Sequence, residues 1–354
     1  MTRTFELQGA WTAIATPFGA DGAVQMEALR KLLDFQIDQG IDGIVPCGTT
    51  GESPTLKPEE QYRIIEVTVA AADGRLGVLV GTGGNDTAKA IHMTKEARAR
   101  GASAALLVDC YYNGPSSLEL RTRYYERVLS EVPDIPIVPY VIPGRSACAL
   151  GAEDLAILHL TDPRRVPAVK QATGDLDRMR RDRELCGPGL AIMSGDDDMT
   201  LAMMRDPAIA SSGVISVMTN LFPAAIKQMV VAQSSGDAAR ASALAEQLAP
   251  VFKLVGCKAE AVRKLPDGRS VTVEDKFKNP VPVKTMMAGL GMLGPACRSP
   301  LGSMTVGAVA ICRDALRRIH AGAPELLAPI GAAFDVDVAR RLGDDSVWSA
   351  LVAA

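Results

Sequence analysis

The sequence predicts an α/β protein: a (β/α)₈ TIM barrel, followed by a C-terminal helical region with an inserted hairpin. The chain has 354 residues, about 100 more than the roughly 250 that one barrel needs. Short apolar runs alternate with longer amphipathic stretches as far as about residue 220, and there are eight such runs. Runs rich in Val, Ile, Leu and Ala are typical of strands buried on both faces of a parallel sheet.

Eight strands alternating with helices favour a closed barrel. An open doubly wound sheet is the alternative, and it would normally carry a glycine-rich phosphate turn after the first strand. Here Thr16-Pro17-Phe18 occupies that place. The candidate strands are residues 11–17, 42–47, 77–82, 104–110, 135–141, 166–171, 190–195 and 213–217.

Helical signals lie between the strands. Residues 25–39 place leucines on one face and stop at Gly40, and Pro58 opens the next helix. Residues 86–100 form a third helical segment. These signals support the alternating pattern of a barrel over residues 1–222.

A C-terminal helical region is predicted for residues 223–354, where the strand signal fades. Asp267-Gly268, between alternating polar and apolar residues, predicts a hairpin over 257–278. The helical segments expected here are 222–256, broken near Gly236, then 281–293, 306–321 and 335–342.

Composition argues against several functional classes. The net charge of −3 does not favour nucleic acid or an anionic membrane. Seven cysteines without a CxxC pair argue against a disulfide framework, and three dispersed histidines argue against a histidine metal site. No apolar run approaches 18 residues, and the first residues lack the pattern of a signal peptide. A cytoplasmic protein without a metal is therefore expected.

The most informative candidate is Lys170, in the apolar run Val-Pro-Ala-Val-Lys of the sixth strand. Barrel enzymes place their working residues at the C-terminal ends of the strands. Desolvation there lowers the pKa of an amine, and a neutral amine can attack a ketone to form an imine. A lysine at a strand end can instead extend its ammonium group to solvent.

Hydroxyl groups and an arginine fall at other strand ends. Tyr140 and Thr49, with a second tyrosine, could relay protons during imine chemistry. The Gly-Thr-Thr-Gly turn that contains Thr49 and Thr50 offers backbone N–H groups to a carboxylate. Arg145 follows a Pro-Gly turn and suits bidentate binding of a carboxylate. Each residue also has a purely structural interpretation: a bonded barrel tyrosine, loop capping, or an ion-paired arginine.

Seven motifs together resemble the dihydrodipicolinate synthase and N-acetylneuraminate lyase superfamily, and most closely its dihydrodipicolinate synthase branch. They occur in order over about residues 9–293. The motifs are GTTGESPTL (48–56), YYNGP (111–115), YVIPGR (140–145), VKQATGDL (169–176), SGDD (194–197), GVISV (213–217) and NPVPVK (279–284).

The resemblance implies roles for the catalytic candidates. Lys170 matches the Schiff-base lysine of the family, and Tyr140 matches the tyrosine that shuttles protons at the imine. Thr49 and Tyr112 match the other members of the proton-relay triad. In the family, the residue matched by Tyr112 reaches across a dimer interface into the neighbouring site. A homo-oligomer, a dimer or a tetramer, is therefore implied.

The resemblance also implies substrate contacts. Thr50 matches the residue that binds the pyruvate carboxylate, and Arg145 matches the arginine that receives the carboxylate of the aldehyde. Gly195 and Ile215 match positions that line the pyruvate pocket. The implied reaction is condensation of pyruvate with L-aspartate 4-semialdehyde to 4-hydroxy-tetrahydrodipicolinate, in lysine biosynthesis, with no metal or organic cofactor. Arg145 favours this short aldehyde over a sugar acid.

Departures from the family pattern leave alternatives open. Val141 replaces the usual Asn and Cys110 the usual Pro. A pyruvate-dependent aldolase or dehydratase acting on another aldehyde or a 2-keto-3-deoxy acid is one alternative, and a binding protein without activity is another. In the family's lysine-feedback site, Pro58, Gln61 and Lys89 stand where histidines and a glutamate would bind lysine. We therefore expect no inhibition by lysine.

Overall fold

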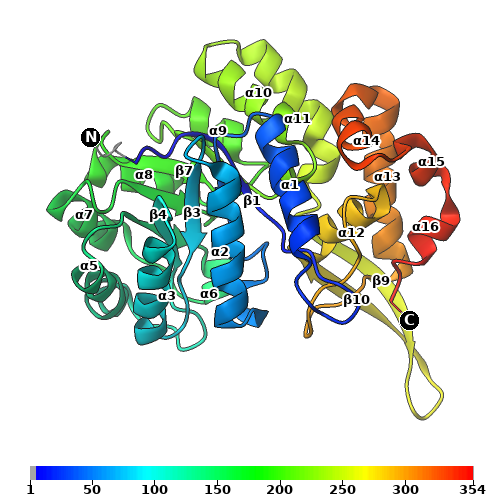
Figure 1. Ribbon diagram of the computed structural model, residues 1–354, viewed down its shortest axis with the longest axis horizontal. Coiled ribbons are helices and arrows are strands. Elements are labelled where there is room, and N and C mark those ends of the chain that lie inside the picture. The colour runs from blue at the N-terminus through cyan, green and yellow to red at the C-terminus, as the bar shows by residue number, and fades with distance from the viewer. Residues whose placement is uncertain (1–4, 354) are drawn as a thin grey trace.

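Eight parallel strands close into a barrel in the computed structural model, which describes residues 5–353 (Figure 1). Each strand pairs with the next in parallel, and β8 pairs with β1 to complete the ring. The predicted TIM barrel is therefore confirmed. The strands are β1 (Gly9–Ala13), β2 (Gly43–Val45), β3 (Gly77–Gly81), β4 (Ala104–Val108), β5 (Ile137–Val141), β6 (Ala168–Gln171), β7 (Ala191–Ser194) and β8 (Gly213–Ser216).

The first strand lies earlier in the chain than expected. The prediction ran from 11 to 17, whereas β1 ends at Ala13. After Ala13 the backbone no longer pairs as a strand, and the residues that follow form hydrogen bonds with loops. The amide of Ala15 donates to the Asn220 side chain at 3.0 Å, and the Thr16 hydroxyl donates to the carbonyl of Gly51 at 2.8 Å. The end of the apolar run therefore belongs to the loops at the barrel mouth.

The helices alternate with the strands as predicted, and local signals set their ends. Asp86 caps α3 by accepting from the amide of Ala88 at 2.9 Å, and Pro58 is the first residue of α2. The helices of this part are α1 (Met26–Asp38), α2 (Pro58–Ala72), α3 (Thr87–Ala99), α4 (Ser117–Glu119), α5 (Glu126–Glu131), α6 (Pro143–Ser146), α7 (Ala152–Thr161), α8 (Leu176–Cys186), α9 (Thr200–Arg205), α10 (Pro223–Ser234) and α11 (Ala238–Phe252). A π-helical segment, η2 (Leu120–Tyr125), joins α4 to α5.

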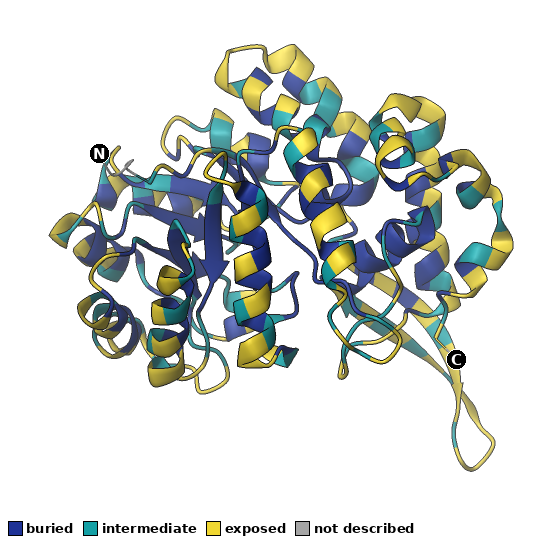
Figure 2. Cartoon of the chain, viewed as in Figure 1, coloured by how far each residue is buried: buried dark blue, intermediate teal, exposed yellow. Residues whose placement is uncertain are grey.

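The interior of the barrel is a hydrophobic core of its own. Alternate residues of each strand point inward, because successive side chains of a strand face opposite sides of the sheet. The inward side chains are buried and include Trp11, Leu106, Val138, Met193 and Ile215. The opposite side chains pack against the surrounding helices, so the barrel strands are mostly dark blue in Figure 2.

The C-terminal helices pack beside the barrel, on the right in Figure 1. One hydrophobic cluster continues from barrel residues such as Ile14 and Phe222 to Leu316 and Ile330 of this region. The first C-terminal helix after the barrel strands, α10, also packs against β1. The barrel and the C-terminal region thus share one hydrophobic cluster. The predicted domain boundary between residues 222 and 223 stays a prediction. The later helices are α12 (Val281–Leu290), α13 (Val306–Gly322), α14 (Ala328–Phe334), α15 (Val338–Gly343) and α16 (Asp345–Ser349).

The hairpin is present and projects from the body of the protein (Figure 1). It consists of β9 (Gly256–Lys264) and β10 (Ser270–Lys278), which pair antiparallel around the turn that contains Asp267 and Gly268. At its base Cys257 and Ala259 are buried, and β9 packs on α13. The prediction of a hairpin over 257–278 is confirmed.

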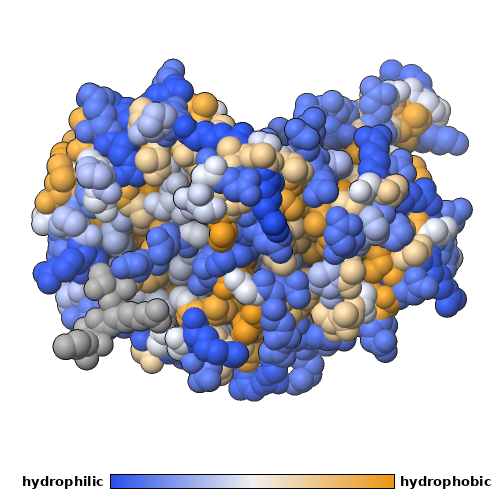
Figure 3. All heavy atoms as spheres, turned by 90° about the horizontal axis from the view of Figure 1, so that it is seen from above, coloured by the Kyte–Doolittle hydropathy of each residue, from blue (hydrophilic) through white to orange (hydrophobic). Residues whose placement is uncertain are grey.

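Polar side chains cover most of the face seen in Figure 3, with smaller apolar groups between them. None of the helices in residues 5–353 is both long enough and apolar enough to cross a membrane.

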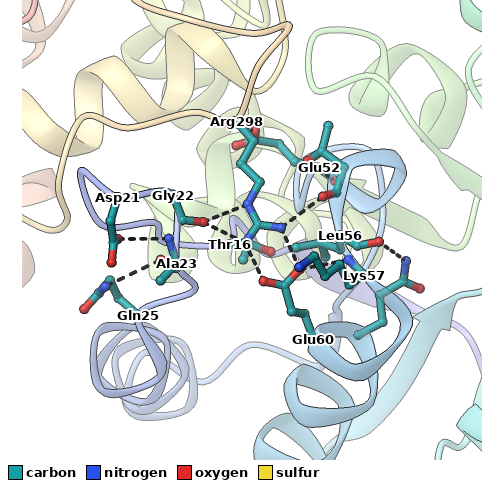
Figure 4. A network of polar contacts seen from close by, with 12 residues as sticks. Thr16, Asp21, Gly22, Ala23, Gln25, Glu52, Leu56, Lys57, Glu60 and Arg298 are labelled. Carbon is teal, nitrogen blue, oxygen red and sulfur yellow. Dashed lines mark hydrogen bonds and ion pairs between the residues drawn. The ribbon is translucent and has the colours of Figure 1, made fainter.

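A buried ion pair joins the C-terminal region to the loop after β2. Nζ of Lys284, on α12, lies 2.6 Å from Oε1 of Glu52, and both side chains are fully buried. The same ammonium group donates to the carbonyl of Thr16 at 3.0 Å. The second carboxylate oxygen of Glu52 accepts from the amide of Arg298 at 2.9 Å. The Arg298 guanidinium pairs in turn with Glu60 (Figure 4).

Removing the cation of this pair is expected to destabilise the protein strongly. In a Lys284→Met variant the Glu52 carboxylate would stay buried without its counter-charge, at a cost of about 3–5 kcal/mol. Urea unfolding followed by circular dichroism measures this change. Lys258→Met is the matched control, because Lys258 pairs with Glu274 on the exposed hairpin at 2.9 Å. Its loss should cost about 0–1 kcal/mol. Equal destabilisation by the two variants would contradict this account.

Candidate active site

Lys170 lies inside the barrel, near the C-terminal end of β6. Ala168, two residues earlier, belongs to the interior core, so Lys170 projects to the same side of the sheet. Its Cα is in register with Tyr140 on β5 and Met193 on β7. The side chain is 4% exposed, and Nζ lies 4.2 Å from the centroid of the Tyr140 ring. The amine therefore faces the barrel interior and does not extend to solvent.

The surroundings of Lys170 lower its pKa to about 8. Desolvation is the largest cause, because burial disfavours the charged ammonium form. The negative charges of Asp196 and Asp197 oppose this shift, and the positive charge of Arg145 adds to it. A substantial fraction of the amine is therefore neutral near physiological pH, as a nucleophile requires.

Tyr140 presents its ring to this amine, and Thr49 lies close enough to Tyr140 to affect the pKa of its phenol. Tyr140 is 6% exposed, and burial raises the pKa of its phenol above the ordinary value. The positive charge of Arg145 and, to a smaller extent, the Thr49 side chain partly offset this rise in pKa. The phenol is consequently protonated at neutral pH and could both donate and accept a proton beside the amine.

A cavity of about 220 Å³ opens in front of these hydroxyls. Thr49, Tyr140 and Arg145 line it, together with Tyr111 and the loop after β3. Lys170 does not line this cavity itself, but its Nζ lies against the ring of Tyr140, which does. The space in front of Tyr140 is open at the end of the barrel where the strands terminate.

The two candidate carboxylate-binding residues share one neighbour, Asn279. The buried Thr50 hydroxyl accepts from Nδ2 of Asn279 at 3.0 Å. The Arg145 guanidinium donates through Nη2 to the backbone carbonyl of Asn279 at 2.9 Å. Arg145 lies five residues after the inward-facing Tyr140, in the short helix α6.

Gly195 and Ile215 lie where the sequence places them. A side chain at Gly195 would put its Cβ 3.1 Å from Cε of Lys170 and 2.8 Å from Cβ of Ala172. Only glycine leaves the lysine its room at this position. Ile215 is fully buried in the same interior cluster as Tyr140. Gly195 therefore borders the space around the amine, and Ile215 belongs to the interior core below it in the same barrel.

Tyr112 is the one predicted site residue that the structure does not bring to this site. Its side chain is 88% exposed, and its backbone is left-handed with φ of 85°. Tyr111, its neighbour, lines the cavity instead. The Tyr112 phenol points away from the site of its own chain.

Comparison with known proteins gives a consistent result. The profile of the Dihydrodipicolinate synthetase family matches residues 6–317. A 4-hydroxy-tetrahydrodipicolinate synthase of Syntrophus aciditrophicus is 36% identical over 312 residues, which cover 88% of this chain and 97% of the relative. The enzyme of that name from Aquifex aeolicus is 38% identical over 298 residues, 84% of this chain and 92% of the relative.

This chain belongs to the dihydrodipicolinate synthetase family. Solved structures of the family superpose on it closely. The dihydrodipicolinate synthase of Aquifex aeolicus has a TM-score of 0.78 at 36% identity, covering 88% of this chain and 98% of the other. The 4-hydroxy-tetrahydrodipicolinate synthase of Methylacidiphilum fumariolicum SolV has a TM-score of 0.80 at 33% identity, covering 93% and 100%. A variant described as monomeric is among these structures, with a TM-score of 0.77 at 29% identity.

Two carboxylates after β7 have different surroundings. Asp197 is buried and accepts from the amides of Val217 and Met218 at 3.1 and 3.2 Å, and from the Ser216 hydroxyl. Asp197 therefore caps the loop that follows β8. Asp196 acts on the pKa of both Lys170 and Tyr140 through its charge. The sequence analysis missed this electrostatic role.

Residues of the C-terminal region were also missed. Asn279 and Lys284 both lie in the motif NPVPVK, to which the sequence analysis gave no role. They bond to Thr50 and Glu52 in the loop after β2, more than 200 positions earlier in the chain. The motif itself was the only available signal. Within residues 5–353, His, Cys, Asp and Glu side chains form no group of three that could hold a metal ion.

The depressed pKa of Lys170 predicts the pH dependence of imine formation. Only the neutral amine attacks a ketone, so below pH 8 the rate of adduct formation with limiting pyruvate should rise about tenfold per pH unit. Above pH 8 it should level off. The rate is measured by trapping with cyanoborohydride and mass spectrometry between pH 6 and 9. Lys170→Arg is the control and should give no adduct.

Replacing Asp196 by Asn should move the same profile to lower pH. The carboxylate of Asp196 stabilises the ammonium form of Lys170 and so raises its pKa, and the amide would not. A profile that is flat between pH 6 and 9 in the unmodified protein would refute the assignment of Lys170 as a partly neutral amine.

Proposed function

We propose that this protein condenses pyruvate with L-aspartate 4-semialdehyde to give 4-hydroxy-tetrahydrodipicolinate, as a class I lyase of lysine biosynthesis. The observation that carries the proposal is the buried amine of Lys170, 4.2 Å from the Tyr140 ring, with a pKa lowered to about 8. The names of the family relatives support the same reaction. A cytoplasmic location and independence of a metal or organic cofactor belong to this proposal.

The chemistry begins at the ketone carbon of pyruvate. The neutral Lys170 amine adds to this carbon, and uptake of one proton with loss of one water gives a protonated imine. The imine withdraws electrons, so a proton leaves the pyruvate methyl group and an enamine forms. The enamine carbon then attacks the aldehyde carbon of the second substrate, and the aldehyde oxygen takes up a proton. Attack of the substrate's own amine on the imine carbon closes the ring and releases Lys170.

Each of these steps moves a proton close to Lys170. The Tyr140 phenol is suited to this role because it remains protonated and carries no charge at neutral pH. Thr49 lies close enough to lower the pKa of the Tyr140 phenol and is assigned the next position in the relay. We assign the third position to Tyr112 of the partner subunit in a homodimer or a tetramer. The exposed phenol and left-handed backbone of Tyr112 suit a side chain presented to a second copy.

Two anion-binding groups hold the two substrates. We assign the pyruvate carboxylate to the Thr50 hydroxyl, next to the relay residue Thr49. Arg145, at the exposed mouth of the cavity, is assigned the carboxylate of the semialdehyde, which a guanidinium binds in bidentate fashion. Gly195 and Ile215 would bound the space around the pyruvate methyl group.

The alternative is an aldolase or dehydratase of the same family with another aldehyde or a 2-keto-3-deoxy acid. Val141, one of the departures that raised it, lies in the hydrophobic cluster between barrel and helices. Its side chain therefore faces away from Lys170, and the substitution bears on packing. The departure at Val141 therefore gives no reason to prefer the alternative substrates.

A substrate panel tests the proposed function. Incubation with pyruvate and hydride should give a mass increase that maps to Lys170. Among L-aspartate 4-semialdehyde, other aldehydes and 2-keto-3-deoxy acids, the semialdehyde should give the highest kcat/KM. An adduct with preference for another acceptor would support the alternative. If no adduct forms on Lys170, the result would support the interpretation as a binding protein without enzymatic activity.

An Arg145→Ala variant separates the two half-reactions in the same assay. It should raise KM for the semialdehyde by about ten- to hundredfold, because a charge-assisted bidentate contact is lost. Formation of the pyruvate adduct should fall far less, because loss of the Arg145 charge removes only the smallest of the causes that shift the pKa of Lys170. Equal loss in both steps would contradict the assignment of Arg145 to the second substrate.

We further propose that lysine does not inhibit the enzyme. Lys89 and Gln61 line the cavity near Tyr111, and Gln61 is already bonded to the carbonyls of Ser53 and Leu56. The ammonium of Lys89 would repel the two ammonium groups of an incoming lysine. Addition of L-lysine up to about 10 mM should leave the rate unchanged at constant ionic strength, with ornithine as the control for charge. A large fall in rate with lysine alone would refute this.

A further inference from the structure

Asn279, in the C-terminal region, bonds to both proposed anion-binding residues, Thr50 and Arg145. It follows directly after the last residue of β10 and is 6% exposed. Its side chain reaches Thr50 in the loop after β2, and its backbone carbonyl reaches Arg145 after β5. The preceding residue, Lys278, donates to the carbonyl of Gly144 at 3.2 Å. One short segment therefore contacts the loop after β2 and the loop after β5.

The bond to Thr50 determines what the Thr50 hydroxyl can do. A hydroxyl has one proton to donate and two lone pairs that accept. Nδ2 of Asn279 has only protons to offer, so at 3.0 Å it occupies a lone pair of the hydroxyl. The proton of Thr50 is then left to point elsewhere. A hydroxyl held in this way is a donor, as a substrate carboxylate requires.

We propose that Asn279 is a positioning residue that sets the Thr50 hydroxyl as a donor to the pyruvate carboxylate. Its carbonyl holds one N–H of Arg145 and so orients the guanidinium toward the second substrate. This inference rests on the proposed function, since it assigns a role within the same site. Asn279 acts through Thr50 and Arg145 and touches neither reacting carbon.

The remaining polar atom of Asn279 distinguishes this role from simple packing. Its Oδ1 is buried and has no hydrogen-bond partner among residues 5–353. A buried acceptor without a partner is costly, and an apolar side chain of similar size would avoid that cost. Retaining an amide here is understandable if its N–H toward Thr50 serves binding.

Asn279→Asp is the most direct test, because the two side chains have the same shape and opposite hydrogen-bonding character. The carboxylate would accept the Thr50 proton and place a negative charge beside the anion site. The pyruvate concentration that half-saturates adduct formation on Lys170 should rise more than about tenfold. Asn279→Ala, which only removes the donor, should raise it about two- to tenfold. KM for the semialdehyde should change less, since the contact with Arg145 uses the backbone.

Asn220→Ala is the matched structural control. Asn220 is also a buried amide, and it bonds to the backbone of Ala13, Ala15 and Val217 without contact to Thr50 or Arg145. It should lower the melting temperature and leave the pyruvate dependence unchanged. A Thr50→Val background gives a second control, because Asn279→Ala should have no further effect on pyruvate binding there.

The outcomes separate this inference from the proposed function. No adduct in the unmodified protein would overturn both. A normal adduct with unchanged half-saturation in folded Asn279→Asp and Asn279→Ala would overturn the role of Asn279 alone. Undiminished effects of Asn279→Ala in the Thr50→Val background would also overturn it, because the effect would then not pass through Thr50.

Discussion

The candidate site depends on the cost of burying one ammonium group. Water stabilises a charged amine far better than a hydrophobic barrel does, so the interior shifts Lys170 toward its neutral form. The barrel produces this environment by strand alternation alone. Lys170 lies two residues after Ala168 and therefore faces the same closed interior. A shift of one residue along β6 would turn the side chain toward the helices.

The amine is not fully neutralised, and the reason lies on β7. Asp196 and Asp197 follow this strand and favour the ammonium form, while desolvation and Arg145 oppose it. The result is a pKa of about 8, so about a tenth of the amine is neutral at pH 7. The same charge balance favours the protonated imine once the amine has reacted. A site without these carboxylates would offer more free amine and less stabilisation of the cationic intermediate.

The parts of the site that sequence could predict are those that local pattern encodes. An apolar run with one lysine, a Gly-Thr-Thr-Gly turn and a tyrosine at a strand end identified Lys170, Thr49, Thr50 and Tyr140, because strand order and pleat alternation then bring them together. Strand ends were less predictable. Apolar residues continue past Ala13, but β1 ends there and Ala15 already bonds to a loop residue. The apolar run alone therefore does not show where the strand ends.

Contacts between distant segments could not be predicted in this way. The pairing of Lys284 with Glu52 has no periodic signal, and two fully buried charges run against the usual exposure of such residues. The role of Asn279 depends on a hydrogen bond across 229 positions. Tyr112 is exposed, and its backbone has a left-handed conformation. Tyrosine rarely adopts this conformation, so the residue type does not predict it.

Residues 279–284 contact the loops of the site although a long hairpin directly precedes them in the chain. Gly256 and Lys278 are partners in the antiparallel register, so the hairpin returns the chain to about 5 Å from where it left. Its length therefore does not alter where Asn279 begins. Residues 279–284 can bind the loops after β1, β2 and β5 regardless of how far the hairpin projects. The C-terminal region thus supports the barrel mouth, and the hairpin is free to vary outside it.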